Sequence, residues 1–406
     1  AGGIYEFSKH AYNNFFSFLM GWSAWLVGNL TTALLITAAI DYIMPDPSQF
    51  WLKIGVSISF IVILNLVAYF GVEGSAFLLI VLAFVSISAL LSLIFPGIPH
   101  INASNYFPFF GLGITSILVT IFFLAESFFG WEGATYLAEE TNEPEKIIPK
   151  AIIIGTIIIG FLGISIAAVS LGIIPWKILV NSNADAPLSL VAERILGSSG
   201  MYLINIGIFV SLMGSAAGNI ITMPRLILAL ARDKLFIAQL SSIHSKYKTP
   251  YKAIIFQTIV SIIVFGMAFG KYKALLSLVL PLGFMMYFFV ILSVPILRAK
   301  EPNIKREFKV PFAKIGSAII LLLIVGILIA WAFSEQNAIK TLKLGISLIF
   351  VGIPVYLLLE TYYNPETIIK INDAFAYITL LTERIILPKK VRNEILELLG
   401  NIKGRK

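Results

Sequence analysis

Two carboxylates lie inside one long apolar stretch, residues 114–137, which reads ITSILVTIFFLAESFFGWEGATYL. This stretch is long enough to cross a bilayer as a helix, and Glu126 and Glu132 are the only charges deep inside any apolar span of the sequence. A carboxylate in hydrocarbon costs roughly 2.5–3.5 kcal/mol even on lenient insertion scales, so it persists where it faces water, an ion or a ligand. Gly130 and Gly133 flank Glu132 and allow the helix to unwind, which exposes backbone polar groups. We predict a helix break near residues 129–131, with a binding site around it.

Each carboxylate also has a structural explanation. On an unbroken helix Glu126 and Glu132 would point about 240° apart, so they share a cavity only if the helix unwinds between them. Glu132 either gates or senses a ligand, or is a structural carboxylate bonded to neighbouring helices. Glu126 either carries a proton or turns to a polar neighbour in the bundle.

The side chains next to the predicted break complete the candidate site. Phe128, Phe129 and Trp131 could wall a pocket and stack on a substrate side chain or cation, and Ser127 lies between them and Glu126. Aromatic residues in membrane helices more often pack against other helices or lipid. Trp131, beside the break, is the strongest candidate of the three.

The composition places the whole chain in a membrane. Apolar residues make up 58% of the sequence, charged residues only 13%, and the mean hydropathy is +0.91, whereas a soluble domain carries roughly 25% charged residues. No series of alternating ten-residue segments suggests an outer-membrane barrel. We predict an all-α membrane protein with ten spans: 15–40, 52–70, 76–95, 109–137, 151–174, 201–224, 253–269, 274–297, 315–333 and 342–359.

The basic residues predict the orientation of these spans. Of the 30 lysines and arginines, 23 fall in the set of connecting segments that includes both ends of the chain. By the positive-inside rule both ends are expected in the cytoplasm, with the protein in the cell membrane. The net charge of +8 then reflects basic loops beside anionic lipid rather than a nucleic-acid partner. The chain has no cysteine and three scattered histidines, so we expect neither a metal site nor a cofactor.

Four motifs, in order, carry a family resemblance. They are GGIY at 2–5 with FLMGW at 18–22; FFGWEGATYLAEE at 128–140, continued by PEK at 144–146 and IPKA at 148–151; RLILALARD at 225–233; and EP at 301–302 with REFKVP at 306–311. Together they make residues 1–360 resemble the amino acid–polyamine–organocation permeases. The resemblance implies a bundle of two inverted five-helix repeats followed by two more helices. It aligns the ten spans with family helices three to twelve, and so implies that this sequence lacks the first two family helices, which include a glycine-rich break that binds substrate.

The resemblance also implies roles for polar residues on other spans. Asn29 resembles a pocket asparagine of arginine/agmatine exchangers, although a buried asparagine can equally join two helices. Asn219 lies on a span next to the implied site. On the same span, Ser211 and Ser215 match a hydroxyl pair that binds Na⁺ in sodium-coupled relatives. Proton-coupled relatives can use a lysine near the position of Ser86, and the span 76–95 contains no lysine; coupling to Na⁺ or H⁺ is left open.

We therefore expect a secondary active transporter for amino acids that works by alternating access, not an enzyme or a channel. Residues 1–363 are the expected transporter domain, and 364–406 a cytoplasmic tail with a short amphipathic helix. Two carboxylates and Asn29 favour a cationic amino acid. A polyamine or neutral amino acid exchanger is the alternative. Without the first two family helices, the chain is expected not to transport by itself.

Overall fold

The computed structural model describes residues 2–108, 113–181, 187–268 and 272–364, in which all regular secondary structure is helical and there is no strand. The α-helices are α1 (Ile4–Ala11), α2 (Asn14–Ile43), α3 (Phe50–Phe70), α4 (Val72–Gly97), α5 (Ile114–Leu124), α6 (Gly133–Tyr136), α7 (Pro144–Ile173), α8 (Trp176–Asn181), α9 (Pro187–Arg232), α10 (Tyr251–Ala268), α11 (Tyr272–Lys300), α12 (Ala313–Ser334), α13 (Ala338–Phe350) and α14 (Gly352–Tyr363). Short 3₁₀ turns are η1 (Pro47–Gln49), η2 (Ile98–His100), η3 (Ala103–Tyr106), η4 (Ala125–Phe128), η5 (Ala138–Glu140) and η6 (Ala238–Ser241).

The spans agree with the sequence prediction. Nine segments of the described chain are long and apolar enough to cross a membrane, and each matches one predicted span. The tenth predicted span, 253–269, corresponds to α10, an apolar helix that is shorter than the others in the described residues. The chain is a multi-pass helical membrane protein, as the composition predicts.

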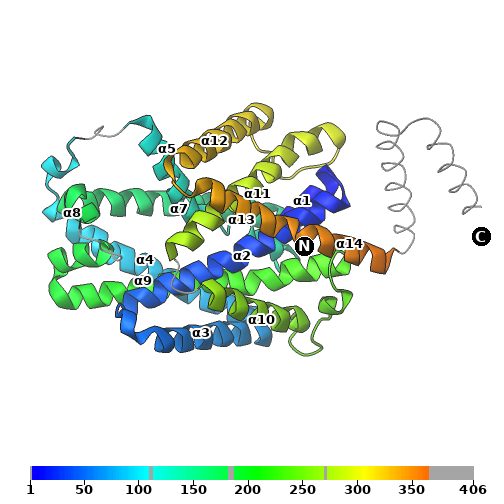
Figure 1. The fold of residues 1–406 in the computed structure, drawn as a ribbon, viewed down its shortest axis with the longest axis horizontal. Coiled ribbons are helices and arrows are strands. Elements are labelled where there is room, and N and C mark those ends of the chain that lie inside the picture. The colour runs from blue at the N-terminus through cyan, green and yellow to red at the C-terminus, as the bar shows by residue number, and fades with distance from the viewer. Residues whose placement is uncertain (1, 109–112, 182–186, 269–271, 365–406) are drawn as a thin grey trace, which may run out of the picture. The chain divides into compact units, whose positions relative to one another are not determined.

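Burial separates the helices at the centre from those that face lipid. The apolar stretch of α2 is 89% buried, whereas that of α4 is 11% buried. A helix that is apolar all round and buried all round belongs to the inside of a bundle. α9 packs along both α2 and α4 (Figure 1), and α3 lies beside α10. The residues that pack between α2 and α9 therefore form the centre of the unit Ala1–Ile353.

Small residues allow α9 to approach its two neighbours closely. A Cβ atom on Gly28 of α2 would lie 2.5 Å from the Met223 sulfur of α9, and one on Gly207 of α9 would lie 2.5 Å from the Cβ of Ala89 on α4. Helices in lipid associate through such van der Waals contact, because lipid is as apolar as their side chains. These glycines set the positions of α2, α4 and α9 relative to one another.

By their contacts, residues Ala1–Ile353 form one unit and residues Pro354–Lys406 a second. The structure describes the second unit only as far as residue 364, the residue after α14. The amphipathic helix predicted in the tail 364–406 lies outside the described residues, and so that prediction stays a prediction.

Candidate functional site

The predicted helix break is confirmed. α5 ends at Leu124, η4 tightens the chain through Phe128, and α6 begins only at Gly133. Phe129 is extended (φ −78°, ψ 145°), and Gly130 has φ +98°, a value that L residues with a side chain rarely adopt. Gly130 is therefore what allows the chain to leave the helix here.

The break leaves backbone polar groups without partners. The N–H of Phe129 donates to the carbonyl of Glu126 and that of Gly133 to the carbonyl of Gly130. Within the described residues, the carbonyls of Phe128 and Phe129 and the N–H of Trp131 make no backbone hydrogen bond, whereas the N–H of Glu132 interacts with its own carboxylate. Because hydrocarbon offers no water to satisfy such groups, irregular backbone at this depth occurs where it is buried in protein or lines a cavity.

Glu132 bridges the break to α11. Its Oε2 accepts a hydrogen bond from the Gly130 N–H at 3.1 Å and a short one from the Tyr287 hydroxyl. Glu132 is 9% exposed, and Tyr287 lies near the middle of α11. The carboxylate thus fastens the unwound segment to a helix that is more than 150 residues away in the sequence.

α9 covers the other side of the break. A Cβ on Gly130 would lie 3.7 Å from the Asn219 Oδ1, and one on Gly133 would lie 3.2 Å from the Thr222 Oγ1. Asn219 and Thr222 are both buried. The structure therefore brings together Gly130, Glu132 and Asn219 from the predicted set.

The aromatic residues at the break pack against other helices. A Cβ on Gly155 of α7 would lie 2.6 Å from the Trp131 ring, and one on Gly283 of α11 would lie 2.1 Å from the Phe129 ring. Phe129 also meets the Tyr287 ring edge-on at 5.3 Å. Phe128 and Ser127 are exposed. Trp131 and Phe129 thus hold the break between α7 and α11, which is the packing role that the sequence left open.

Glu126 does not join Glu132. It is half-buried in η4 and interacts electrostatically with Tyr272, at the start of α11. Glu132 meets α11 fifteen residues later, at Tyr287, which is about 22 Å further along a helix. The helix unwinds between the two carboxylates, but they face different levels of α11.

Asn29 belongs to a separate network that joins α2 to α10. Its Oδ1 accepts from the Gln257 Nε2 at 2.8 Å and from the Ser261 hydroxyl at 3.2 Å, and its Nδ2 donates to the Trp25 carbonyl. The Trp25 indole N–H donates to the Gln257 Oε1 at 2.7 Å. All four side chains are buried. The structure supports the interhelical role for Asn29.

The predicted ion-coupling serines lie further along α9. The Ser215 hydroxyl donates to the Ser211 carbonyl at 3.2 Å, and Ser215 is exposed. Ser211 and Ser86 of α4 both line a cavity of about 140 Å³. Because Ser215 uses only its proton in this bond, its oxygen lone pairs stay free to accept a cation.

At the end of α9, Asp233 holds α1 in place. Its carboxylate accepts hydrogen bonds from the Tyr5 hydroxyl and the Lys9 ammonium of α1. Burial alone would raise the pKa of Asp233, but the hydrogen bonds from Lys9 and Tyr5 outweigh it and lower the pKa below its usual value. Asp233 is therefore charged at neutral pH.

Two arginines of α9 bind the segment that follows α6. Arg232 Nη1 lies 2.7 Å from Glu139 Oε2, and Arg225 Nε lies 3.1 Å from Glu140 Oε1. Arg225 is 2% exposed and also donates to the Ile221 carbonyl. The short helix after the break is thus anchored to α9 at its far end.

Comparison with known proteins identifies the family. A sequence model described as amino acid permease matches residues 1–359. The chain belongs to the amino acid permease family. It is 23% identical to a branched-chain amino acid permease of Bacillus subtilis over 82% of this chain and 75% of the relative. It is 26% identical to a serine/threonine exchanger of the same organism, covering 87% of this chain and 81% of the relative. A vacuolar cationic amino acid transporter of Arabidopsis thaliana is 28% identical, over 60% of this chain and 41% of the relative.

The resemblance drawn from the four motifs is therefore confirmed, and this permease is an amino acid transporter rather than an enzyme. Sequence reasoning missed Tyr287, Thr222 and Gln257. Each is a polar side chain inside an apolar helix, which is the signal that could have found them. Their partners could not be found in the same way, because each partner lies on a different helix.

Proposed function

We propose that this permease binds the ammonium and carboxylate groups of an amino acid at the unwound segment 128–132 and moves it by alternating access. The observation that carries the proposal is the set of unpaired carbonyls and the unpaired N–H beside Gly130. Carbonyls at Phe128 and Phe129 suit an ammonium group, and the N–H at Trp131 suits a carboxylate. Broken helices in transporters expose such groups to their substrates.

In this proposal the contact between Glu132 and Tyr287 controls whether substrate can move past the break. The hydrogen bond joins α11 to the unwound segment, so the two elements cannot separate while it is intact. Arg232 with Glu139 and Arg225 with Glu140 hold the next segment to α9. Movement of substrate past this point requires these contacts to open. Hydrogen bonds and ion pairs of this kind favour one conformation and still allow the other to be populated.

For the substrate, we propose a neutral amino acid. The preference for a cationic one rested on Glu126, Glu132 and Asn29. Glu132 already accepts two hydrogen bonds, and Asn29 is used by the network with Gln257. The branched-chain permease and the serine/threonine exchanger agree with a neutral substrate. Two observations still favour a cationic amino acid or a polyamine: Glu126, which lies away from Tyr287, and the similarity to the vacuolar cationic amino acid transporter of Arabidopsis thaliana.

We further propose that the protein lies in the cell membrane with both ends of the chain on the cytoplasmic side, because 23 of the 30 basic residues are on that side of the predicted topology.

For the driving ion, Ser211 and Ser215 are candidates to bind Na⁺, and the carboxylates Glu126 and Glu132 are candidates to carry H⁺. The free lone pairs of Ser215 favour Na⁺.

The test is radiolabelled leucine uptake by the full-length gene product in proteoliposomes, with Na⁺ and pH gradients varied separately. Unlabelled leucine, serine, arginine, putrescine and glutamate are the competitors. We expect leucine or serine to compete best, and Glu126→Gln to keep that order. If arginine or putrescine competes best and Glu126→Gln abolishes the preference, the substrate is cationic and the neutral proposal is wrong.

A further inference from the structure

The loop between α11 and α12, residues 301–312, is exposed and mixes basic with apolar side chains. From residue 298 to 314 the chain has six lysines and arginines against two glutamates. In the same loop Ile304, Phe308 and Val310 are each about half exposed, and Phe312 is 82% exposed. Large apolar side chains that are exposed to this extent mark a surface that contacts a partner or a membrane. Lysines beside them are not expected in a protein interior.

The lipid-facing side of α12 continues directly into this loop. Phe312, Ile315, Ile319, Leu322, Ile329 and Phe333 recur at helical spacing and are all exposed. α12 has 22 residues, so it is about 33 Å long, close to the roughly 30 Å of a bilayer's hydrocarbon core. Phe312 and Phe333 mark the two ends of that core. The loop before Phe312 therefore lies at the level of the lipid headgroups.

The backbone around Phe312 supports this placement. Phe312 has φ +48°, in the left-handed region where glycine is normally found and a bulky residue is strained. A large side chain at a strained and exposed position gains nothing from contacts within the protein. It gains free energy if its ring enters hydrocarbon.

The basic residues of the loop divide into two groups. Arg306 donates to the carbonyls of Leu297 and Glu301, and Arg298 donates to the carbonyl of Val310, so these arginines shape the loop. Lys305 pairs with Glu307.

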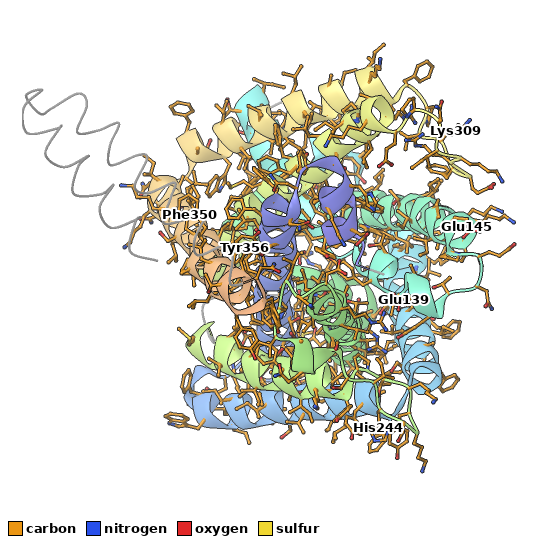
Figure 2. All side chains as sticks on the ribbon, turned by 90° about the vertical axis from the view of Figure 1, so that its right-hand side faces the viewer. Glu139, Glu145, His244, Lys309, Phe350 and Tyr356 are labelled. Atoms are coloured by element: carbon orange, nitrogen blue, oxygen red, sulfur yellow. The ribbon has the colours of Figure 1, made fainter. Side chains whose placement is uncertain are left out.

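Lys309 and Lys314 form no ion pair with another described residue, and both are exposed. In the view of Figure 2, Lys309 lies at the rim of the helices and points away from them. The two lysines are therefore the ones free to bind an anion outside the protein.

We propose that the α11–α12 loop is a docking surface for anionic phospholipid headgroups. Lys309 and Lys314 bind the phosphate, and Phe312 inserts between the acyl chains below it. Lysine side chains reach from the edge of the hydrocarbon toward the headgroups in this way. The surface recognises a lipid rather than a soluble anion, because Phe312 adds an apolar contact that only a lipid can fill. The proposal is independent of the transported substrate.

The test measures the thermal unfolding midpoint of the intact protein in detergent. Phosphatidylglycerol, phosphatidylcholine with the same acyl chains, and soluble glycerol phosphate are titrated separately. We expect phosphatidylglycerol to raise the midpoint at much lower concentration than phosphatidylcholine, and glycerol phosphate to have no effect. Equal responses to the two lipids, or a response to glycerol phosphate alone, overturn the proposal.

A matched pair of double variants locates the effect. Lys309→Gln with Lys314→Gln removes two exposed charges at one end of α12, and Lys340→Gln with Lys343→Gln removes two exposed charges beyond its other end. The first pair should weaken the apparent affinity for phosphatidylglycerol about 30-fold, and the second should leave it unchanged. Equal weakening by both pairs shows non-specific attraction and contradicts the assigned surface.

Phe312→Gly separates lipid contact from folding. Glycine relieves the positive φ, so the midpoint without lipid should be kept or raised. The stabilisation by phosphatidylglycerol should fall, because the ring that enters the hydrocarbon is gone. If that stabilisation stays at its original size, the role given to Phe312 is wrong.

Discussion

Two buried polar clusters lie within the membrane-spanning helices of this permease. One is Glu132 with Tyr287, at the break that follows η4. The other is Asn29 with Trp25, Gln257 and Ser261, between α2 and α10. Glu132 and the four side chains of the second cluster are buried, Tyr287 is half-buried, and both clusters join helices far apart in the sequence. They differ in the backbone that carries these side chains. α2 and α10 are continuous helices, whereas the segment 129–132 is not helical.

That difference separates a structural cluster from a binding site. In the α2–α10 network the side chains satisfy one another, so little polarity is left to attract a ligand. At the break, the carbonyls of Phe128 and Phe129 and the N–H of Trp131 have no backbone partner. A buried polar side chain inside a membrane is therefore not enough to identify a site. The unpaired backbone next to it is the better guide.

The largest effect should come from changing the backbone at the break. Gly130→Val forces a branched side chain into φ +98°, which costs roughly 1–3 kcal/mol or displaces the segment. We expect leucine uptake in proteoliposomes to fall by about tenfold or more. Gly160→Ala is the matched control, because a Cβ there meets open space on α7. Normal uptake by Gly130→Val would show that the break is not part of the transport path.

The next effect concerns the hydrogen bond that fastens the break to α11. Tyr287→Phe removes one hydrogen bond to the Glu132 carboxyl group, and Glu132→Gln weakens the same bond from the other side. Each should lower uptake by about tenfold. The double variant should be little worse than either single one, because both act on one contact. Fully additive losses would mean that the two residues act separately.

A smaller effect, on stability rather than on substrate choice, is expected in the second cluster. Gln257→Leu removes three hydrogen bonds, each worth about 0.6 kcal/mol between membrane helices. The thermal unfolding midpoint should fall, and the order of competing amino acids should stay the same.

Asn29→Ala tests more directly whether the second cluster contacts substrate, and we expect it to keep the same order of competing amino acids. If it changes that order, Asn29 contacts the substrate and the two clusters are not as different as the structure indicates.

The smallest effect belongs to Asp233, outside the spans. Its folded-state pKa is lowered by Lys9 and Tyr5. The contribution of Asp233 to the free energy of unfolding is therefore fully present above the unfolded-state pKa of about 3.9. It is lost as pH falls through the lower folded-state value. Thermal unfolding followed from about pH 5 to about pH 2 should show this loss, and Asp233→Asn should reduce it. An identical pH profile in the variant would assign the loss to other carboxylates.

The sequence by itself determined which segments span the membrane and where one of them breaks. Hydropathy and span length are properties of consecutive residues, so the ten spans could be read without a structure. The break near Gly130 could be predicted for the same reason, because a glycine beside an intramembrane carboxylate acts on its own stretch of backbone. The four motifs likewise identified the family.

Only the tertiary structure decided what each polar side chain faces. Glu132 turns to Tyr287 on α11, and Asn29 turns to Gln257 on α10. Trp131 packs on Gly155 of α7. In each case the partner lies on a helix that the local pattern cannot select, since an apolar helix in lipid can pack against any neighbour with a matching surface. Which neighbour it meets depends on where small residues such as Gly28 and Gly207 let the helices approach.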